Sequence, residues 1–172
     1  MNKIDISTLP KETLVELIGM LANNAITVDG LWFTGVEERF GLETAVEIDT
    51  DAWGRYGSTE ARRIRETLNI SEEGIPALIK ALNFQVWVRA KGFDYEILQP
   101  ADNKVVFNIT DCRVQRVRIK KGIGEFPCKP VGIALFEEFG KAVDPRFKFR
   151  CLVCPPDEHP DDLWCSWEYT ID

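Results

Sequence analysis

The chain has 172 residues, of which 45% are hydrophobic, so it can bury a sizeable core, and one domain over residues 1–172 is the expectation. Its formal net charge of -7 argues against nucleic acid as a partner, because binding the phosphate backbone requires clustered Lys and Arg. The densest group of basic residues lies within residues 113–121 and is expected to be the solvated face of a helix or strand.

The N-terminal residues lack the apolar run of a secretory signal, so we expect a cytoplasmic protein with reduced thiols. The most apolar long segment, residues 14–32, is interrupted by Glu16, Asn23, Asn24 and Asp29. We therefore expect neither a membrane span nor a membrane partner.

Residues 11–40 are predicted to form one long helix. Their apolar residues recur at alternating steps of three and four, which is the spacing of a single buried stripe. The stripe consists of Leu14, Ile18, Leu21, Ala25, Val28, Trp32 and Val36. Pro10 is a plausible start signal and Gly41 a plausible stop, whereas Gly30 is a candidate point for a bend or a split.

Residues 42–69 continue with a helical composition, and Gly54 and Gly57 predict a break between two helical pieces. A further helix is predicted over residues 71–82, where a serine at the start can cap the first turn. Residues 1–82 should therefore form a mainly helical layer.

The apolar period then changes from helical spacing to alternation, which is typical of strands with one buried face. Strands are predicted over residues 84–88, 95–97, 105–109, 147–151 and 164–171, and helices over 111–121 and 131–143. Residues 83–172 should thus form a sheet with inserted helices and a Cys-rich end. The fold class that follows is α+β, with the N-terminal helical layer packed on an antiparallel sheet.

Five cysteines, an odd number for a disulfide framework, all lie in this second half. Cys151, Cys154, His159 and Cys165 follow the pattern C-x2-C-x4-H-x5-C, and thiolates with imidazole can satisfy tetrahedral zinc. Cys128 begins a predicted helix, whose N-terminal amides favour a thiolate, so it is either an extra metal ligand or a reactive thiol.

A second interpretation of the same residues needs no metal. Cys151 and Cys165 can fill core-facing strand positions as small hydrophobic side chains, with His159 in a solvated loop beside several aspartates. The spacing by itself leaves both interpretations open.

The end of the chain also has a recognisable order of features. A cysteine precedes a Gly/Ala-containing helix, a strand ends in a cysteine, and another cysteine stands just before a terminal strand of aromatic residues and Glu. The residues are Cys128-Lys129-Pro130-Val131-Gly132-Ile133-Ala134, Phe136, Phe139, the strand 147–154 and Cys165-Ser166-Trp167-Glu168-Tyr169. This ending resembles 4-vinyl reductase-type domains and the related L-2-amino-thiazoline-4-carboxylate hydrolases, including a branch of cytosolic proteins from anaerobes.

The resemblance implies the fold of ligand-binding domains in NO signalling and Golgi transport, which heme-binding NO sensors share with Bet-type tethering subunits. By the same resemblance, Cys128, Cys154 and Cys165 are the positions most expected to matter, with Cys151 as the alternative to Cys154. The final loop departs from the family, since it has two prolines and His159 where a short glycine turn is usual. That placement of the sole histidine argues against heme.

Two functions are expected, and the resemblance to tethering subunits adds a third class, a protein-interaction scaffold, for which no specific residue argues. The first is a cytosolic small-molecule-binding domain with a zinc site, an apolar or heterocyclic ligand, and a cavity between helices and sheet. Trp32, Trp53, Trp87 and Phe136 are candidate cavity residues. The second is a metal- or cysteine-dependent hydrolase of a small heterocycle, in which Cys128 or a metal-bound water attacks. A carboxylate would then move protons, and the candidates are Glu37, Asp49 and Glu168. A homodimer is compatible with either function.

Overall fold

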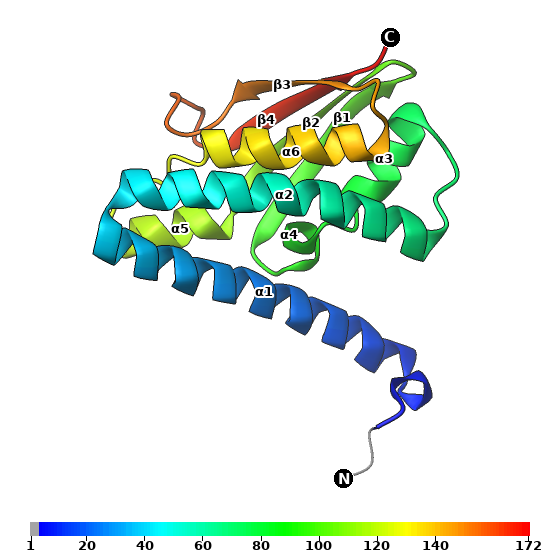
Figure 1. The fold of residues 1–172 in the computed structure, drawn as a ribbon, viewed down its shortest axis with the longest axis horizontal. Helices are drawn as coiled ribbons and strands as arrows, with labels where there is room; N and C mark the ends of the chain where they lie inside the picture. Colours follow the sequence, from blue (N-terminus) through cyan, green and yellow to red (C-terminus); the bar gives the residue numbers. More distant parts are fainter. Residues whose placement is uncertain (1–3) are drawn as a thin grey trace.

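A computed structural model describes residues 4–172 and shows helices packed on one antiparallel sheet (Figure 1), which confirms the predicted α+β class. The first three residues, on which part of the expectation about a secretory signal rests, lie outside this range. After a short 3-10 turn (Ile6–Thr8), the helices are α1 (Lys11–Phe40), α2 (Leu42–Leu68), α3 (Gly74–Leu82), α4 (Val86–Arg89), α5 (Arg113–Lys120) and α6 (Lys129–Val143). The strands are β1 (Phe93–Ala101), β2 (Lys104–Cys112), β3 (Lys148–Val153) and β4 (Cys165–Thr170).

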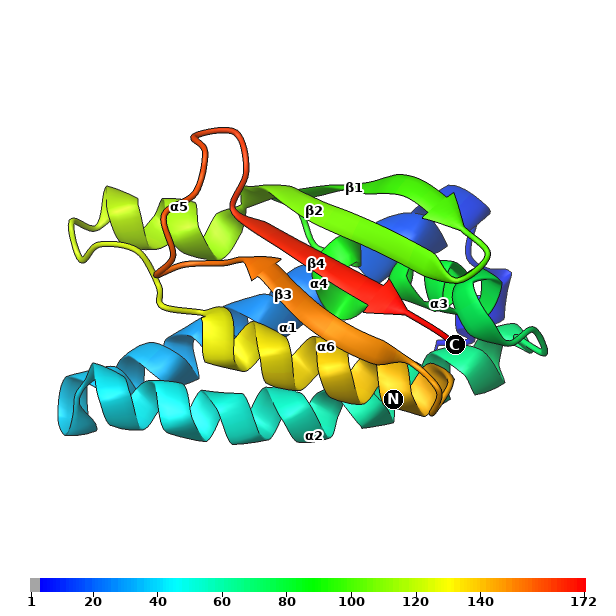
Figure 2. The ribbon, with the colours of Figure 1, turned by 90° about the horizontal axis from the view of Figure 1, so that it is seen from above.

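The sheet has the strand order β1-β2-β4-β3, and every neighbouring pair is antiparallel. Helix α6 lies between the sheet and α2, and α1 crosses below α2 (Figure 1). The loop between β3 and β4 lies at the same end of the molecule as α5 and the start of α6 (Figure 2). Segments that are distant in the sequence therefore meet at this end.

Two glycines of α2 do not break the helix, so the predicted division at Gly54 and Gly57 is wrong. They allow α6 to approach instead. A Cβ atom at Gly57 would overlap the carbonyl oxygen of Leu135, and one at Gly54 would lie 3.3 Å from the Cβ of Ala134. The cost of glycine in a helix is offset here by close packing, which local composition does not reveal.

The strand predicted over residues 84–88 is also wrong, because Val86–Arg89 forms the single turn α4. The buried carboxylate of Glu60 accepts a 2.6 Å hydrogen bond from the backbone N–H of Val86 and a 3.3 Å bond from the Gln85 amide. The bond from Val86 satisfies the first free backbone amide of the turn. An alternation over so few residues fits one helical turn as well as a strand.

The long helix α1 is confirmed, and it runs through Gly30 without interruption. The prediction that its apolar stripe is buried is wrong, because Ile18, Leu21 and Val28 are 55%, 60% and 65% exposed. The face that packs on the rest of the molecule contains Ala22, Ile26 and Phe33. Helix α1 thus has two apolar faces, and periodicity cannot say which of them covers the core.

Alternation along β4 divides its side chains between the two faces of the sheet. Trp167 and Tyr169 point toward the helices, where each packs against a glycine of α6, Gly132 and Gly140 respectively. The phenol of Tyr169 donates a hydrogen bond to the carbonyl oxygen of Phe136. Cys165, two residues before Trp167 at the start of β4, faces the same helices.

Candidate functional site

Three cysteine sulfurs meet at the end of the sheet beside the start of α6. Cys128 is the residue just before α6, Cys154 follows β3, and Cys165 begins β4. The sulfur of Cys154 lies 3.4 Å from that of Cys128 and 3.4 Å from that of Cys165. All three sulfurs lie within 4.8 Å of one another.

Contacts of Lys129 hold the loop after β3 against the start of α6. Its backbone N–H donates a 3.0 Å hydrogen bond to the carbonyl oxygen of Pro155. Its ammonium group lies 2.8 and 2.9 Å from the carboxylate oxygens of Asp157, which also accepts a 3.4 Å hydrogen bond from the backbone of Cys154. The loop conformation therefore places Cys154 beside Cys128.

The buried side chain of Gln115 holds the segment before Cys128 from the other side. Its amide exchanges hydrogen bonds of 2.8 and 2.7 Å with the backbone of Phe126, and its Nε2 lies 3.5 Å from the sulfur of Cys128. Since Gln115 is on α5 and Cys128 begins α6, this clamp joins the two helices across their connecting loop.

The three thiols share their protons unequally. Hydrogen bonds from the thiols of Cys154 and Cys165 hold the pKa of Cys128 well below its usual value. The same interaction with Cys128 raises the pKa of both Cys154 and Cys165, and burial adds to the rise. The cluster thus favours one thiolate, at Cys128, solvated by two thiols.

The sulfur positions are close to those of a zinc centre. With Zn–S bonds of about 2.3 Å, tetrahedral geometry separates neighbouring sulfurs by about 3.8 Å. The two 3.4 Å contacts need to lengthen by only a few tenths of an ångström. The donor set and its spacing therefore fit a tetrahedral soft-metal ion with three protein ligands.

A cavity of about 540 Å³ adjoins this cluster, and Cys128 and Cys165 are part of its wall. Most of the wall is apolar and comes from α1, α2, α5, α6 and the helix-facing side of the sheet. The predicted cavity residues Trp53, Trp87 and Phe136 line it. Trp32 does not belong to the wall, since it lies half-exposed on the outer side of α1.

One family model matches nearly the entire chain. A family described as "Family of unknown function (DUF6125)" matches residues 7–171. The chain belongs to this family. A search of curated proteins finds no match. All three clustered cysteines and the cavity lie within the matched residues of this DUF6125 chain.

Two of the predicted metal ligands are not in the cluster. Cys151 lies opposite Trp167 in the β3–β4 pair, and burial raises its pKa to about 11. The ring of His159 packs 5.0 Å from that of Trp164, and its Nε2 lies 3.5 Å from a carboxylate oxygen of Glu125. Within residues 4–172, the structure therefore brings Cys128, Cys154 and Cys165 together and leaves Cys151 and His159 apart.

The carboxylates proposed to move protons have different surroundings. Glu37 forms a two-point ion pair with Arg118, at 2.7 and 3.0 Å, which lowers the pKa of Glu37. Glu168 faces the side of the sheet opposite the cavity, and its ion pairs with Lys104 and Arg150 lower its pKa. Asp49 alone of the three lines the cavity.

Sequence reasoning missed one cavity residue that carries chemistry, Asp29, and considered Cys112 only as a thiol at the start of a helix. Asp29, on α1, also lines the cavity, and its Oδ1 accepts a 3.2 Å hydrogen bond from the indole of Trp53. Cys112, at the end of β2, lines the cavity too, and burial raises its pKa to about 12. An acidic residue inside an otherwise apolar segment, as at Asp29, is the signal that could have drawn attention.

Proposed function

We propose that this chain is a small-molecule-binding domain in which Cys128, Cys154 and Cys165 hold a zinc ion in the wall of the ligand cavity. One observation carries the proposal. Two of the three converging cysteines, Cys128 and Cys165, also line the cavity of about 540 Å³. A purely structural metal site would not require its ligands to line a ligand cavity.

Three protein ligands leave one position of a tetrahedral zinc ion for another donor. Zinc sites that bind exogenous molecules keep such an open position, whereas structural sites are closed by four protein ligands. Since two of the three ligands lie on the cavity wall, a ligand in the cavity is the natural fourth donor. Zinc would also neutralise thiolate charge in a mostly buried cluster.

The cavity itself supports a small organic ligand. Its volume lies within the usual range for small-molecule sites, roughly 300–1,000 Å³, and its wall includes Trp53, Trp87, Phe136 and Trp167. Aromatic walls favour an apolar or heterocyclic ligand. The expected cytoplasmic location suits this function, because reduced thiols are needed to bind the metal.

Metal analysis of full-length protein purified without a His tag tests the proposal. We expect about one zinc per chain in the unmodified protein and loss of that zinc in the Cys154→Ser variant. Cys151→Ser is the matched control, since its sulfur lies outside the cluster, and it should retain zinc. Unmodified protein that is metal-free and takes up no zinc at micromolar concentration would contradict the proposal.

A second candidate function is a cysteine-dependent hydrolase of a small heterocycle. The lowered pKa of Cys128, a residue on the cavity wall, is the specific observation that favours it. The thiolate would bond to the carbon of a C–N or C–S bond. That C–N or C–S bond would break as the leaving nitrogen or sulfur takes a proton from Asp49. Water would then attack the carbon bound to Cys128 and give a proton back to Asp49, which releases the product and the Cys128 thiolate. Glu168 faces away from the cavity, so Asp49 replaces it in this scheme.

Thiol alkylation separates the two candidates. In a metal-free hydrolase, iodoacetamide at pH 7 should modify Cys128 first, well before Cys112 and Cys151, because burial raises the pKa of both. In a zinc protein, all three clustered thiols should stay protected until a chelator is added. Peptide mapping by mass spectrometry distinguishes these patterns.

A further inference from the structure

A pair of aspartates lies on the cavity wall, where α1 meets α2. Asp29 and Asp49 both line the cavity, and Asp49 is only 4% exposed. The indole N–H of Trp53 donates to Asp29, and the nearby charge of Asp29 adds to the burial that raises the pKa of Asp49. The two carboxyl groups are therefore neighbours in one buried site.

This pair has no cation of its own among residues 4–172. The basic side chains of the same wall have other partners: Arg118 is paired with Glu37, and Arg113 donates to Asn23 and Thr27. The third, Lys121, lies near the carboxylate of Glu37. A buried carboxylate without a counter-charge is costly, since removing its hydration is not repaid. Such a site is incomplete until a positive or donor group enters it.

Other polar groups of the same wall also lack partners. The Nε of Arg118 and the indole N–H of Trp167 are buried and make no hydrogen bond to any described residue. Both residues line the cavity. More than nine-tenths of buried polar groups in proteins are hydrogen-bonded, and both of these groups are N–H donors, so they indicate a ligand that also carries an acceptor atom.

We propose that Asp29 and Asp49 bind a protonated nitrogen of the ligand, so that the cavity selects small molecules with an apolar body and a basic amine or amidine group. The inference rests on the proposed small-molecule-binding function and specifies its ligand class. Two carboxyl groups can accept hydrogen bonds from one ammonium or amidinium group, and charge-assisted bonds of this kind are among the strongest in proteins. The aromatic walls would bind the apolar body.

Three probes with the same ring system test this assignment: 1-naphthylmethylammonium, neutral 1-naphthylmethanol and anionic 1-naphthoate. Binding to the full chain can be followed by quenching of tryptophan fluorescence, since Trp53, Trp87 and Trp167 line the cavity. We expect the ammonium probe to bind at least about tenfold more tightly than the alcohol, and the carboxylate to bind most weakly. The Asp29→Asn/Asp49→Asn double variant should remove the difference between ammonium and alcohol.

The controls separate this inference from the proposed function. Asp51→Asn, on the exposed side of α2, should leave the preference for the ammonium probe intact. Equal binding of ammonium and alcohol would overturn the inference but leave the small-molecule-binding function standing. Failure of all three probes to bind would overturn both.

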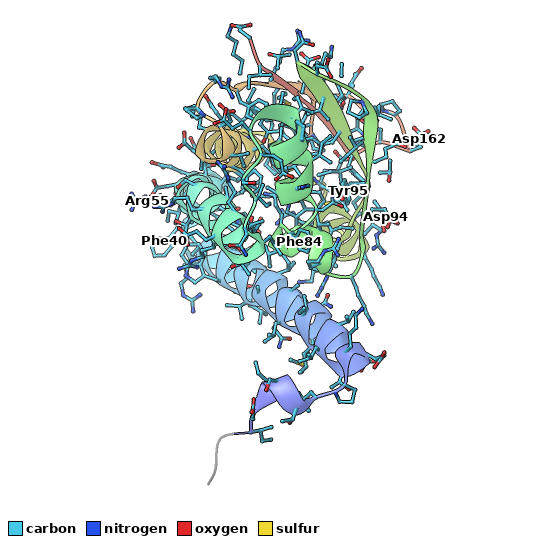
Figure 3. All side chains as sticks on the ribbon, turned by 90° about the vertical axis from the view of Figure 1, so that its right-hand side faces the viewer. Phe40, Arg55, Phe84, Asp94, Tyr95 and Asp162 are labelled. Carbon is cyan, nitrogen blue, oxygen red and sulfur yellow. The ribbon has the colours of Figure 1, made fainter. Side chains whose placement is uncertain are left out.

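An independent observation concerns the outer face of α1. The side chains of its N-terminal part project into open space with no other element beside them (Figure 3). The exposed residues Ile18, Leu21, Ala25, Val28 and Trp32 follow the four-three spacing of a coiled-coil seam. Exposed apolar residues at this spacing are rarely left to solvent, because they form a continuous patch.

Helix α1 is also long and apolar enough to cross a membrane by length and composition. Its other face, however, is bound to the rest of the molecule. The Oδ1 of Asn23 accepts hydrogen bonds from the backbone of Lys91, at 3.0 Å, and from Arg113, at 3.1 Å, and Asp29 accepts one from Trp53. A membrane span would break these bonds, and a net charge of -7 disfavours an anionic lipid surface.

The geometry points to a second copy of this chain as the partner that covers this seam, with α1 packed against α1 of the partner. The large side chains of the seam, Ile18, Leu21, Val28 and Trp32, are 55%, 60%, 65% and 48% exposed, so a partner helix would cover a continuous row of apolar groups. Ala25 lies at the centre of the seam, where a small side chain allows two helices to approach. Such a patch is self-complementary, as a two-fold dimer requires.

Sedimentation equilibrium of the full chain at micromolar concentration tests the dimer. We expect twice the chain mass for the unmodified protein and a monomer for Leu21→Glu/Val28→Glu, with unchanged circular dichroism. Leu68→Glu, at an exposed apolar position near the end of α2, should remain dimeric. A monomeric unmodified protein would overturn the proposal, as would a monomer that sediments with phosphatidylcholine–phosphatidylglycerol vesicles.

Discussion

The sulfur atoms of Cys128 and Cys154 lie 3.4 Å apart, although 26 residues separate them in the chain. The two sulfurs are close because the start of α6 packs against the loop after β3. The salt bridge between Lys129 and Asp157 stabilises that meeting. The chemistry of the cluster consequently depends on how a helix and a hairpin pack together.

Metal removal should destabilise the protein. If the three clustered thiolates hold zinc, a chelator such as dipicolinate should lower the melting temperature of the unmodified protein by several degrees, because a bound metal stabilises only the folded state. The melting temperature of Cys154→Ser should not respond to the chelator. Differential scanning fluorimetry with and without dipicolinate checks this, and an equal response of both proteins would contradict it.

Asp49→Asn should change how stability depends on pH. Burial, with the charge of Asp29 as a further cause, raises the pKa of Asp49 from 3.8 to about 7 in the folded protein. The folded state therefore holds this proton more tightly, and stability falls as pH rises from about 4 through about 7. The variant should flatten this dependence and raise the free energy of unfolding at pH 8 by on the order of 2 kcal/mol.

Urea denaturation at pH 5 and pH 8 measures the effect. Asp51→Asn, whose carboxylate is exposed on the same helix, should behave like the unmodified protein at both pH values. An Asp49→Asn variant that is less stable than the unmodified protein at pH 8 would show that the carboxylate makes a favourable native contact instead.

Asp144→Asn should destabilise the protein at neutral pH. The buried carboxylate of Asp144 accepts hydrogen bonds from Arg146, at 2.6 and 2.9 Å, and from the backbone of Gly74, at 3.0 Å. These contacts, the Arg146 bonds first, hold the pKa of Asp144 well below its usual value of 3.8. Their contribution is thus fully present above pH 4 and is lost as pH falls below it.

We expect Asp144→Asn to lower the free energy of unfolding at pH 7 by about 2 kcal/mol, because a charge-assisted network loses its charge. The difference from the unmodified protein should shrink toward pH 2. A difference of constant size across this range, in urea denaturation, would argue that the network acts through shape rather than charge.

Gly57→Ala should weaken the packing of α2 on α6. The added methyl group would overlap the carbonyl oxygen of Leu135, so the helices must separate, at a cost of about 2 kcal/mol. Gly30→Ala is the matched control, because a Cβ atom there meets nothing within 4 Å. Thermal unfolding should show a lower melting temperature for Gly57→Ala and an equal or higher one for Gly30→Ala.

Much of the fold follows from the sequence alone, because strand alternation and helical spacing are local properties. The period of two at Val105, Phe107 and Ile109 predicts β2, and Pro10 and Gly41 bound α1 as expected. The same local pattern failed at Val86–Arg89, where a carboxylate supplied by α2 stabilises a helical turn. It also failed at Gly57, whose role is a contact with another helix.

The candidate site shows the same division. The residue types and spacing of Cys151, Cys154, His159 and Cys165 are compatible with a soft-metal site, because zinc binds thiolates and imidazole, but they fit core packing equally well. Only the tertiary structure decides that Cys128 completes the cluster, that Cys151 stays out of it, and that Asp29 reaches the cavity. A sequence states which side chains a segment carries, whereas their meeting depends on how helices and strands from distant segments pack together.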